Sequence, residues 1–197
     1  MDAKNFEITI NRLKNDIIKA VQHDLPRAVG VMAVNHFKDN FRRSGFVNGG
    51  LHPWQKTKRQ MGDSPGVDSR WGPLTSGRNH LMSSIESHPG VGQVTISNPV
   101  PYASIHNEGG NKTTHPAVTP KMRKFAWAMT YSIAGVDGKL PKELPREAER
   151  WRGLALTKKS RITINAHIPQ RKFIGDSIEL NKKIEAKILQ VLSKFTQ

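Results

Sequence analysis

The sequence predicts an α+β fold with N-terminal helices, a twisted, mainly antiparallel sheet and a C-terminal helix packed on the sheet. Apolar residues recur every three or four positions near both ends of the chain, which is the helical pattern. Between these ends lie short alternating segments bounded by Pro and Gly, such as 93–97 and 161–165. A length of 197 residues suffices for one core. We therefore expect a single domain over 1–197, with a long loop near 44–73 and a basic insertion near 111–167.

Two helices are expected at the N-terminus. The stripe of the first consists of Ile10, Leu13, Ile17, Ile18, Val21 and Leu25. Asp24-Leu25-Pro26 should break this helix, with Asp24 as a cap and Pro26 in the first turn of the second helix. The residues expected on the buried side of the second helix are Val29, Met32, Ala33, His36, Phe37 and Phe41.

A long loop should follow the second helix, because the chain from Ser44 to Gly72 is rich in Gly, Pro and Lys. Trp54 and Trp71 stand within it, and we expect them to pin the loop either onto the body of the domain or onto a neighbouring subunit. Thr75 is then a candidate cap for a short helix that contains Leu81.

The sheet is expected to be built from four strands, near residues 91–97, 113–118, 154–157 and 161–166. A helix should interrupt them, because Thr119-Pro120 is a start signal and Gly135 a stop signal. Its apolar stripe consists of Met122, Phe125, Met129 and Ile133, and Trp127, which lies off the stripe, is a candidate interface residue. Residues 136–153 are expected to form a mobile excursion.

Two phrases about sixty residues apart carry the strongest local signals. They are Val-Pro-Tyr-Ala-Ser-Ile-His-Asn-Glu-Gly-Gly at 100–110 and Ile-Pro-Gln-Arg-Lys-Phe-Ile-Gly-Asp-Ser at 168–177. Pro101 should end the preceding strand. Tyr102, Ala103 and Ile105 should then dock on the core from one helical turn, which Gly109 stops through a positive φ. Ser177 is the expected N-cap of the last helix. The apolar residues of that helix are Ile178, Ile184, Ile188, Val191, Leu192 and Phe195.

These phrases resemble the hallmark of the phage virion morphogenesis family, the Mu-like tail-completion proteins and their relatives at the head-tail junction. In that family a Pro-Tyr-Ala-x-x-His-x-x-Gly turn is followed by an Ile-Pro-x-Arg-x-Phe-(Leu/Ile)-Gly turn and a last helix. The family-motif anchors in this sequence are Pro101, Tyr102, Ile105, His106, Gly109, Pro169, Arg171, Phe173 and Gly175. The phrase Gly50-Leu-His-Pro-Trp54 is similar to a Gly-x-x-Trp loop of the family.

The resemblance implies a structural protein of a phage or prophage that completes the tail or joins head to tail. Such a protein is made in the cytoplasm of the bacterial host, enters the virion, and has other head-tail or tail proteins as partners. Family analogy implies a homo-oligomeric ring of six. Ring closure requires two different surface patches on each subunit. The loop with Trp54 and Trp71 and the basic insertion are the candidates.

The net charge of +15 is concentrated between the two phrases, where residues 111–172 contain 14 Lys and Arg against 4 acidic residues. Such an excess attracts either a polyanion, which would place the protein near DNA, or an acidic neighbouring subunit. A solvated surface that keeps the protein soluble is the other interpretation. The candidate basic patch consists of Lys121, Arg123, Lys124, Lys158, Lys159 and Arg161. The alternative function is a stand-alone basic nucleic-acid-binding module.

No catalytic, cofactor-binding or metal-binding residues are expected, so the protein is predicted not to be an enzyme. His106-Asn107-Glu108 with nearby His115 suggests a nuclease centre only weakly, because nucleases need several ligands converging on a metal ion. The sequence also lacks a phosphate-binding loop and a Gly-x-Ser-x-Gly motif. With no cysteine, disulfides and thiolate metal sites are excluded. No apolar run reaches the roughly 18 residues of a membrane span, so no membrane contact is expected.

Overall fold

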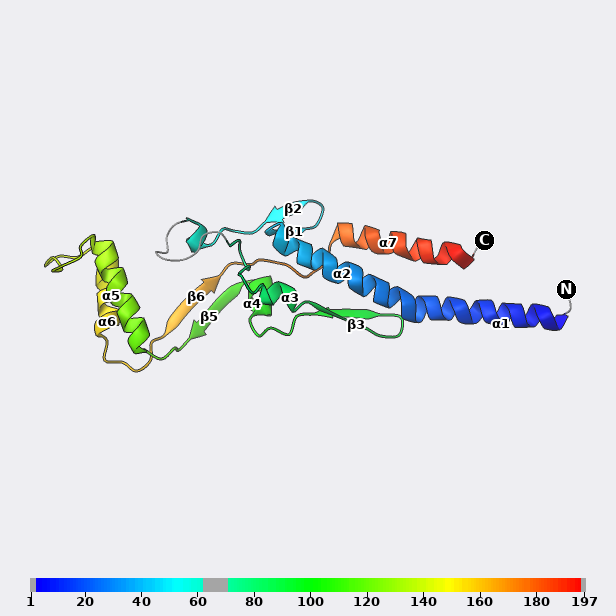
Figure 1. Ribbon diagram of the computed structural model, residues 1–197, viewed down its shortest axis with the longest axis horizontal. Helices are drawn as coiled ribbons and strands as arrows, with labels where there is room; N and C mark the ends of the chain where they lie inside the picture. Colours follow the sequence, from blue (N-terminus) through cyan, green and yellow to red (C-terminus); the bar gives the residue numbers. More distant parts are fainter. Residues whose placement is uncertain (1–2, 62–70, 196–197) are drawn as a thin grey trace. The chain divides into compact units, whose positions relative to one another are not determined.

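The computed structural model describes residues 3–61 and 71–195. The chain divides into two compact units, which are described separately: unit 1 comprises 1–110 and 168–197, and unit 2 comprises 111–167 (Figure 1). About 52% of the chain is helical and 14% is in strands of small antiparallel sheets, which confirms the α+β class. Unit 2 covers the segment that the sequence analysis describes as a basic insertion, and it is compact.

The N-terminal part of unit 1, from Ala3 to Arg42, is one continuous helical rod rather than two separate helices. Helix α1 (Ala3–Lys19) continues through the π-helical turn η1 (Ala20–Asp24) into α2 (Leu25–Arg42). The predicted break is therefore wrong: Asp24 has helical dihedral angles and makes no capping hydrogen bond with its side chain.

The π-helical turn explains how the rod accommodates a proline. The N–H of Leu25 donates to the carbonyl of Ala20, five residues back. Pro26 has no N–H, so the carbonyl of Gln22 loses its usual helical partner. That carbonyl instead accepts a hydrogen bond of 2.9 Å from the N–H of Gly92, at the tip of the β3–β4 hairpin. The tertiary hydrogen bond from Gly92 thus replaces the helical bond that Pro26 cannot make.

Helix α2 packs against the hairpin of β3 (Glu86–Pro89) and β4 (Val94–Ser97), which pair antiparallel. Gly30 makes this close approach possible, because a Cβ there would lie only 3.0 Å from Cβ of Ser87. The buried side chains of α2 include the predicted Ala33, His36, Phe37 and Phe41, whereas Val29 and Met32 are half-buried.

The predicted long loop contains regular structure. Strands β1 (Gly45–Val47) and β2 (Leu51–Pro53) form a hairpin, and the 3-10 turn η2 (Lys58–Met61) follows; residues 62–70 of this loop lie outside the described part of the chain. The expected helix after Thr75 shortens to α3 (His80–Ser83). Thr75 does not cap it, because the Thr75 hydroxyl donates to the carbonyl of Gly72 in a turn of its own.

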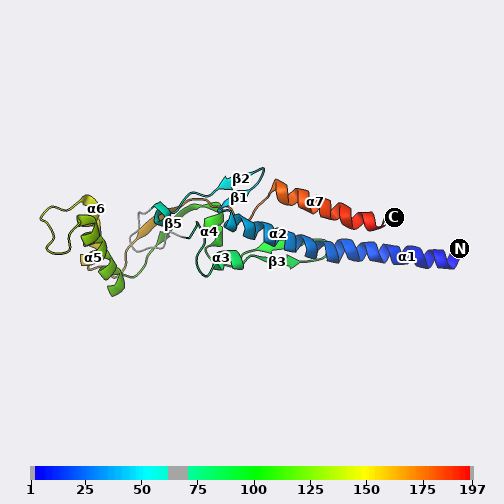
Figure 2. The same cartoon turned by 45° about the horizontal axis from the view of Figure 1, so that its top comes forward.

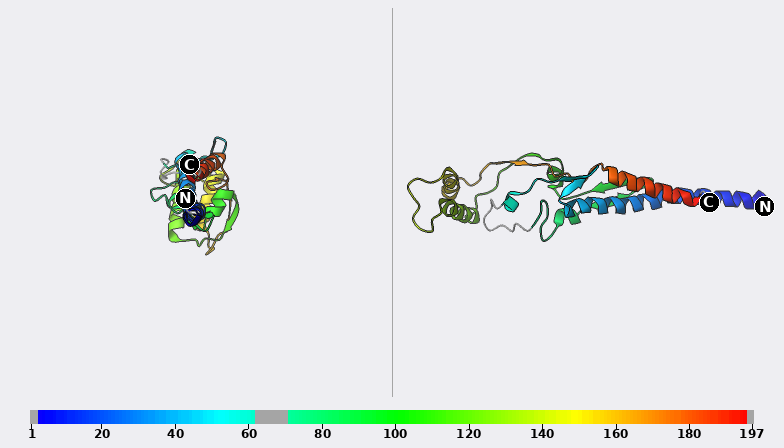
Figure 3. Two further views of the ribbon diagram at one scale, coloured as in Figure 1. Left: turned by 90° about the vertical axis from the view of Figure 1, so that its right-hand side faces the viewer. Right: turned by 90° about the horizontal axis from the view of Figure 1, so that it is seen from above.

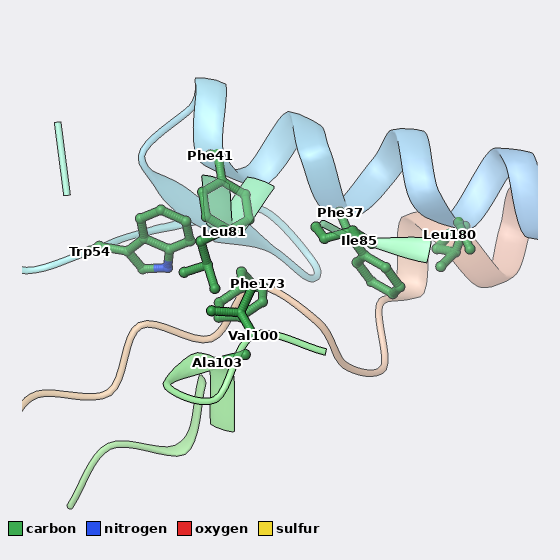
Figure 4. Close-up of a cluster of buried hydrophobic side chains, with 10 residues drawn as sticks. Phe37, Phe41, Trp54, Leu81, Ile85, Val100, Ala103, Phe173 and Leu180 are labelled. Carbon is green, nitrogen blue, oxygen red and sulfur yellow. The ribbon is translucent and has the colours of Figure 1, made fainter. Parts of the chain in front are cut away.

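The core of unit 1 joins α2 to segments far apart in the sequence (Figure 4). Its buried members are Ala33, Phe37, Phe41, Trp54, Leu81, Ile85, Val100, Ala103, Phe173 and Leu180. The ring of Phe41 lies at the centre, 5.0 Å from the ring of Phe173 and 5.4 Å, edge-on, from that of Trp54. This core therefore holds α2, the Trp54 loop and both sequence phrases together.

The C-terminal helix α7 (Ile178–Leu192) begins where predicted, because the Ser177 hydroxyl accepts a hydrogen bond from the N–H of Leu180, and the turn η3 (Ser193–Phe195) follows it. Helix α7 packs against α2 (Figures 2 and 3). Leu180 is its buried side chain, whereas Ile178 and Leu192 of the predicted stripe are exposed. In the described part of the chain, no helix is both long and apolar enough to span a membrane.

The strands form separate ribbons instead of the expected single sheet. Within the described residues there are three two-stranded sheets: β1–β2, β3–β4, and β5 (Gly110–Thr114) with β6 (Ile164–Ile168). The predicted strand near 91–97 contains β4, whereas those near 113–118 and 161–166 overlap β5 and β6 only at 113–114 and 164–166. Their pairing continues past the strands, where Ala117 and Arg161 form an antiparallel bridge.

Unit 2 is built on the β5–β6 ribbon and a pair of packed helices, α5 (Pro120–Ala134) and α6 (Arg146–Leu156). Helix α5 has its predicted caps, since Thr119 accepts from the N–H of Met122 and Gly135 is left-handed. The predicted strand at 154–157 is wrong, and so is the predicted mobile excursion over 146–153, because α6 spans Arg146–Leu156. Ala148 and Ala155 form the buried face of this helix.

The buried face of α5 also differs from the predicted stripe. Ala126 and Thr130 are fully buried, whereas Phe125 is 52% exposed and its ring lies edge-on to that of Trp151. Small residues on both helices allow close packing of the two backbones, so the large apolar side chains lie at the edges of the contact. Hydrophobic periodicity predicts a buried stripe through Phe125 and Met129, one residue before the buried Ala126 and Thr130.

The burial of His36 predicts an acid-sensitive unfolding equilibrium. Burial, aided by the positive charge of Lys183, lowers the pKa of His36 below 6.5. The unfolded chain then binds the proton first, so the free energy of unfolding should fall as the pH drops from about 6.5 towards the folded-state pKa. The free energy of unfolding, measured by chemical denaturation between pH 5 and 7.5, should depend less steeply on pH in the His36→Gln variant than in the parent. An identical pH dependence in the two proteins would contradict this.

Candidate structural site where the two motifs meet

The two sequence phrases lie against each other in unit 1 and are joined by hydrogen bonds. Helix α4 (Ala103–Glu108) carries the first phrase, and the second crosses it as an extended segment. Asn107 is the central clamp, because its Oδ1 accepts from the N–H groups of Phe173 (2.8 Å) and Ile174 (3.0 Å), while its Nδ2 donates to the Ile174 carbonyl (3.1 Å). The N–H of Arg171 also donates to the carbonyl of His106, at 2.8 Å.

Gly109 allows the second phrase to pass close behind α4. Its φ of 74° and ψ of −175° belong to a region that is essentially restricted to glycine. A Cβ on Gly109 would lie 2.7 Å from the backbone N of Gln170 and 2.9 Å from its Cα. The predicted positive φ is thus confirmed, and the residue has a second role that sequence reasoning did not reveal.

Helix α2 holds the other side of the second phrase through a buried asparagine. Asn40 is fully buried, and its Nδ2 donates to the carbonyl of Phe173 at 3.1 Å. Its Oδ1 accepts from the N–H of Val47 at 3.2 Å, which ties strand β1 to the same point. Phe173 is therefore fixed through its backbone by two asparagines and through its ring by Phe41.

The Trp54 loop completes the joint from a third direction. The indole N–H of Trp54 donates to the carbonyl of Lys172 at 2.9 Å. Nε and Nη2 of Arg171 donate to the carbonyl of Gln55 at 3.2 and 3.1 Å. Arg171 is buried, and this burial lowers the pKa of its guanidinium. Arg171 therefore acts as an internal tie, and Trp54 pins the loop onto the body of its own unit, one of the two predicted alternatives.

A second set of bonds fixes the start of α7 to the β1–β2 turn. The Glu179 carboxylate accepts from the N–H groups of Gly49 (3.1 Å) and Gly50 (3.0 Å), while Asn48 Oδ1 accepts from the N–H of Ile178 (3.0 Å). The backbone amide of Glu179 itself, followed by those of Gly49 and Gly50, lowers the pKa of this carboxyl group. The negative charge suits the positive end of α7.

The family-motif anchors differ in their surroundings. Phe173 and Arg171 are buried, whereas Ile105, His106, Pro169 and Gly175 are half-buried. Pro101 is exposed, and the predicted burial of Tyr102 is wrong, since 40% of this residue is exposed. Its ring lies 5.9 Å from that of His106, edge-on. Ala103, the next residue, is buried in the core, as predicted.

The other two candidate interface tryptophans are closer to solvent. Trp71 is exposed and borders a shallow pocket of about 290 Å³ next to Gly72 and Met82. Trp127 is half-buried on α5, where its ring lies 6.1 Å from that of Tyr131. These two residues remain accessible to a partner, unlike Trp54.

The candidate basic patch gathers at one end of the α5–α6 pair in unit 2. Arg123 brings the start of α5 to the end of α6, because its Nη1 donates to the carbonyls of Ala155 (3.1 Å) and Thr157. Arg161 donates to the carbonyl of His115 at 3.3 Å. These two arginines thus support the fold of unit 2. The exposed lysines of the patch are Lys121, Lys124, Lys158 and Lys159.

Sequence reasoning missed Asn40 and Asn107, whose side chains hold the joint. The available signal is a polar residue at an interior helical position: Asn40 lies between two buried phenylalanines of α2. Among the described residues, no group of three or more His, Cys, Asp or Glu side chains is placed to hold a metal ion. The polar groups that meet at the joint are used to hold backbone segments together.

Comparisons with known proteins gave no match: no family model fits the sequence, and neither the curated proteins nor the solved structures include a significantly similar chain.

Proposed function

We propose that this protein is a structural component of a phage or prophage particle that completes the tail or joins head to tail, and that it acts by assembly and not as an enzyme. The observation that supports this function best is the joint between the two motifs. Among the residues that carry the family resemblance, Arg171 and Phe173 hold separate turns of unit 1 together. Such a joint suits a protein whose task is to keep its shape in an assembly.

The partners under this proposal are other head-tail or tail proteins, and the protein enters the virion after synthesis in the cytoplasm of the bacterial host. A ring of six, by family analogy, needs two different patches on each subunit. The Trp71 segment and unit 2 supply them in our proposal, because Trp71 and Trp127 are accessible whereas Trp54 lies in the core.

Unit 2 is proposed to face the DNA channel or an acidic partner. It contains 12 Lys and Arg against 4 acidic residues. The exposed lysines at the end of the α5–α6 pair are suited to this contact, because their amino groups make no hydrogen bond or ion pair within the described residues. Their attraction to a polyanion should weaken steeply with salt.

Reversal of these charges should stop assembly without unfolding the protein. Lys121, Lys124, Lys158 and Lys159 can all be changed to Glu, while Arg123 and Arg161 are kept because they support unit 2. We expect a melting temperature within a few degrees of the parent, since exposed substitutions each change stability by about 0.5 kcal/mol or less. In a complementation assay with a phage that lacks this gene, infectious particles should be lost and unjoined heads and tails should accumulate.

The matched control reverses four exposed cations of unit 1, Lys56, Arg78, Lys182 and Lys194, and so changes the net charge equally. This control should complement normally. Normal particle yield from the unit 2 variant would instead show that its charge is only a solvated surface. DNA binding by a monomer, with no role in particles, would favour the stand-alone nucleic-acid-binding module.

A further inference from the structure

Helix α1 has an apolar row that its own unit leaves uncovered. Phe6, Ile10 and Leu13 are 57%, 47% and 38% exposed, and Ile17 and Ala20 are half-buried. Of the described elements, only η1, the direct continuation of the helix, has extensive contact with α1. In Figure 1, α1 continues the line of α2 past the end of α7. The row is therefore available to a partner.

This row does not extend the core face of α2. The buried residues of α2 follow the spacing Pro26, Gly30, Ala33 and Phe37. The π-helical turn η1 holds about one residue more than an α-helical turn, so this face continues backwards through Gln22, Ile18, Asn15 and Asn11. The apolar row lies on another side of the rod. Packing in the interior of unit 1 therefore does not explain its regular helical spacing.

The spacing of the row is that of a coiled-coil seam. Phe6, Ile10, Leu13, Ile17 and Ala20 are separated by four, three, four and three residues, which is the a/d pattern of a heptad. Ile10 and Ile17 then occupy a positions, and Phe6, Leu13 and Ala20 occupy d positions. A helix of identical sequence is the partner with the same spacing.

We propose that α1 pairs antiparallel with α1 of a second copy of this chain. Opposing Ile10 with Leu13 of the second copy also opposes Phe6 with Ile17. Glu7 and Lys14 occupy the flanking e positions, and in this register each carboxylate of Glu7 meets Lys14 of the other copy, twice in the pair. A parallel pair would instead place Asp16 opposite Val21 and Thr9 opposite Lys14. Charge complementarity therefore selects the antiparallel pair.

Introduced cysteines test this pairing directly, because the chain has no cysteine of its own. On mild oxidation, a mixture of Phe6→Cys and Ile17→Cys chains should form the mixed disulfide dimer. Phe6→Cys alone should not cross-link, because eleven residues of helical offset separate the two sulfurs by about 16 Å. Cross-linking of Phe6→Cys with itself would show a parallel pair, and no cross-linking in any mixture would show no pair; either result overturns the proposal.

Analytical ultracentrifugation over a range of protein concentrations measures the dissociation constant of the α1 pair, which allows a seam variant to be compared with a matched control. The double variant Ile10→Glu and Leu13→Glu should raise the dissociation constant of the α1 pair at least 100-fold while the melting temperature of the monomer is retained. The control double variant, Ile8→Glu and Ile18→Glu, changes residues that are 58% and 40% exposed but lie off the seam. It should change the dissociation constant of the α1 pair less than threefold. Equal effects of the two variants would overturn the proposal.

A charge swap tests the orientation separately. Glu7→Lys and Lys14→Glu should each weaken the pair, and the double swap should restore it, because only the antiparallel register brings these side chains together. Failure of the double swap to restore pairing would contradict that register. None of these readouts depends on particle assembly, so the α1 pair and the proposed virion role can fail independently.

Discussion

Replacement of Phe173 by Ala should destabilise the protein by about 3–5 kcal/mol, the usual cost of removing a buried aromatic side chain. Phe173 is 1% exposed and its ring packs 5.0 Å from that of Phe41, at the point where both motifs and α2 meet. The cavity would open in the middle of this joint. Thermal or urea unfolding followed by circular dichroism measures the loss.

Phe125→Ala is the matched control, because Phe125 is 52% exposed although it touches Trp151. Its removal should cost about 1 kcal/mol or less, a value that includes the aromatic pair. A Phe173→Ala protein that melts within a degree or two of the parent would mean that the second motif is a surface turn. The packing role assigned to it would then be wrong.

A single added methyl group at Gly109 should have an effect of similar size. The backbone conformation there is disfavoured for any residue with a Cβ by about 1–3 kcal/mol. In addition, the Cβ would meet Gln170 N at 2.7 Å, and relieving such overpacking typically costs about 1–3 kcal/mol. Gly109→Ala should therefore lose about 2–6 kcal/mol in the same unfolding experiment.

Gly135→Ala separates the two causes. Gly135 also has a positive φ, 68°, but nothing lies within 4 Å of the position that its Cβ would occupy. Its replacement should cost about 1–2 kcal/mol, from backbone strain alone. If the two variants lose equal stability, the second motif moves aside without cost, and the close approach at Gly109 is not a constraint on the joint.

The helix termini were predictable because their signals are local. Thr119 and Ser177 cap α5 and α7 through bonds to amides three residues ahead, and Gly135 takes the left-handed conformation that ends α5. Such bonds depend on neighbours in the sequence and not on the rest of the fold. The α+β class was accessible for a similar reason, because the hydrophobic periodicity changes along the chain.

Other elements could not be predicted because tertiary contacts override local signals. Asp24 and Pro26 are strong break signals, yet the rod continues, since Gly92 from a distant hairpin satisfies the carbonyl that Pro26 leaves open. The segment at 154–157 alternates like a strand. It is helical up to Leu156 because Ala155 packs against α5. Local preferences differ by only about 1 kcal/mol per residue, so packing decides these cases.

The sequence by itself determined the helical ends of the chain, the basic segment between the motifs, and the motifs whose resemblance suggests a virion role. Only the tertiary structure decided which polar residues hold the joint, because Asn40 and Asn107 bond to backbone groups 133 and 66 residues away. It also decided that Trp54 and Arg171 are internal while the apolar row of α1 is exposed. Burial is a property of what packs against a residue, and that partner lies elsewhere in the chain.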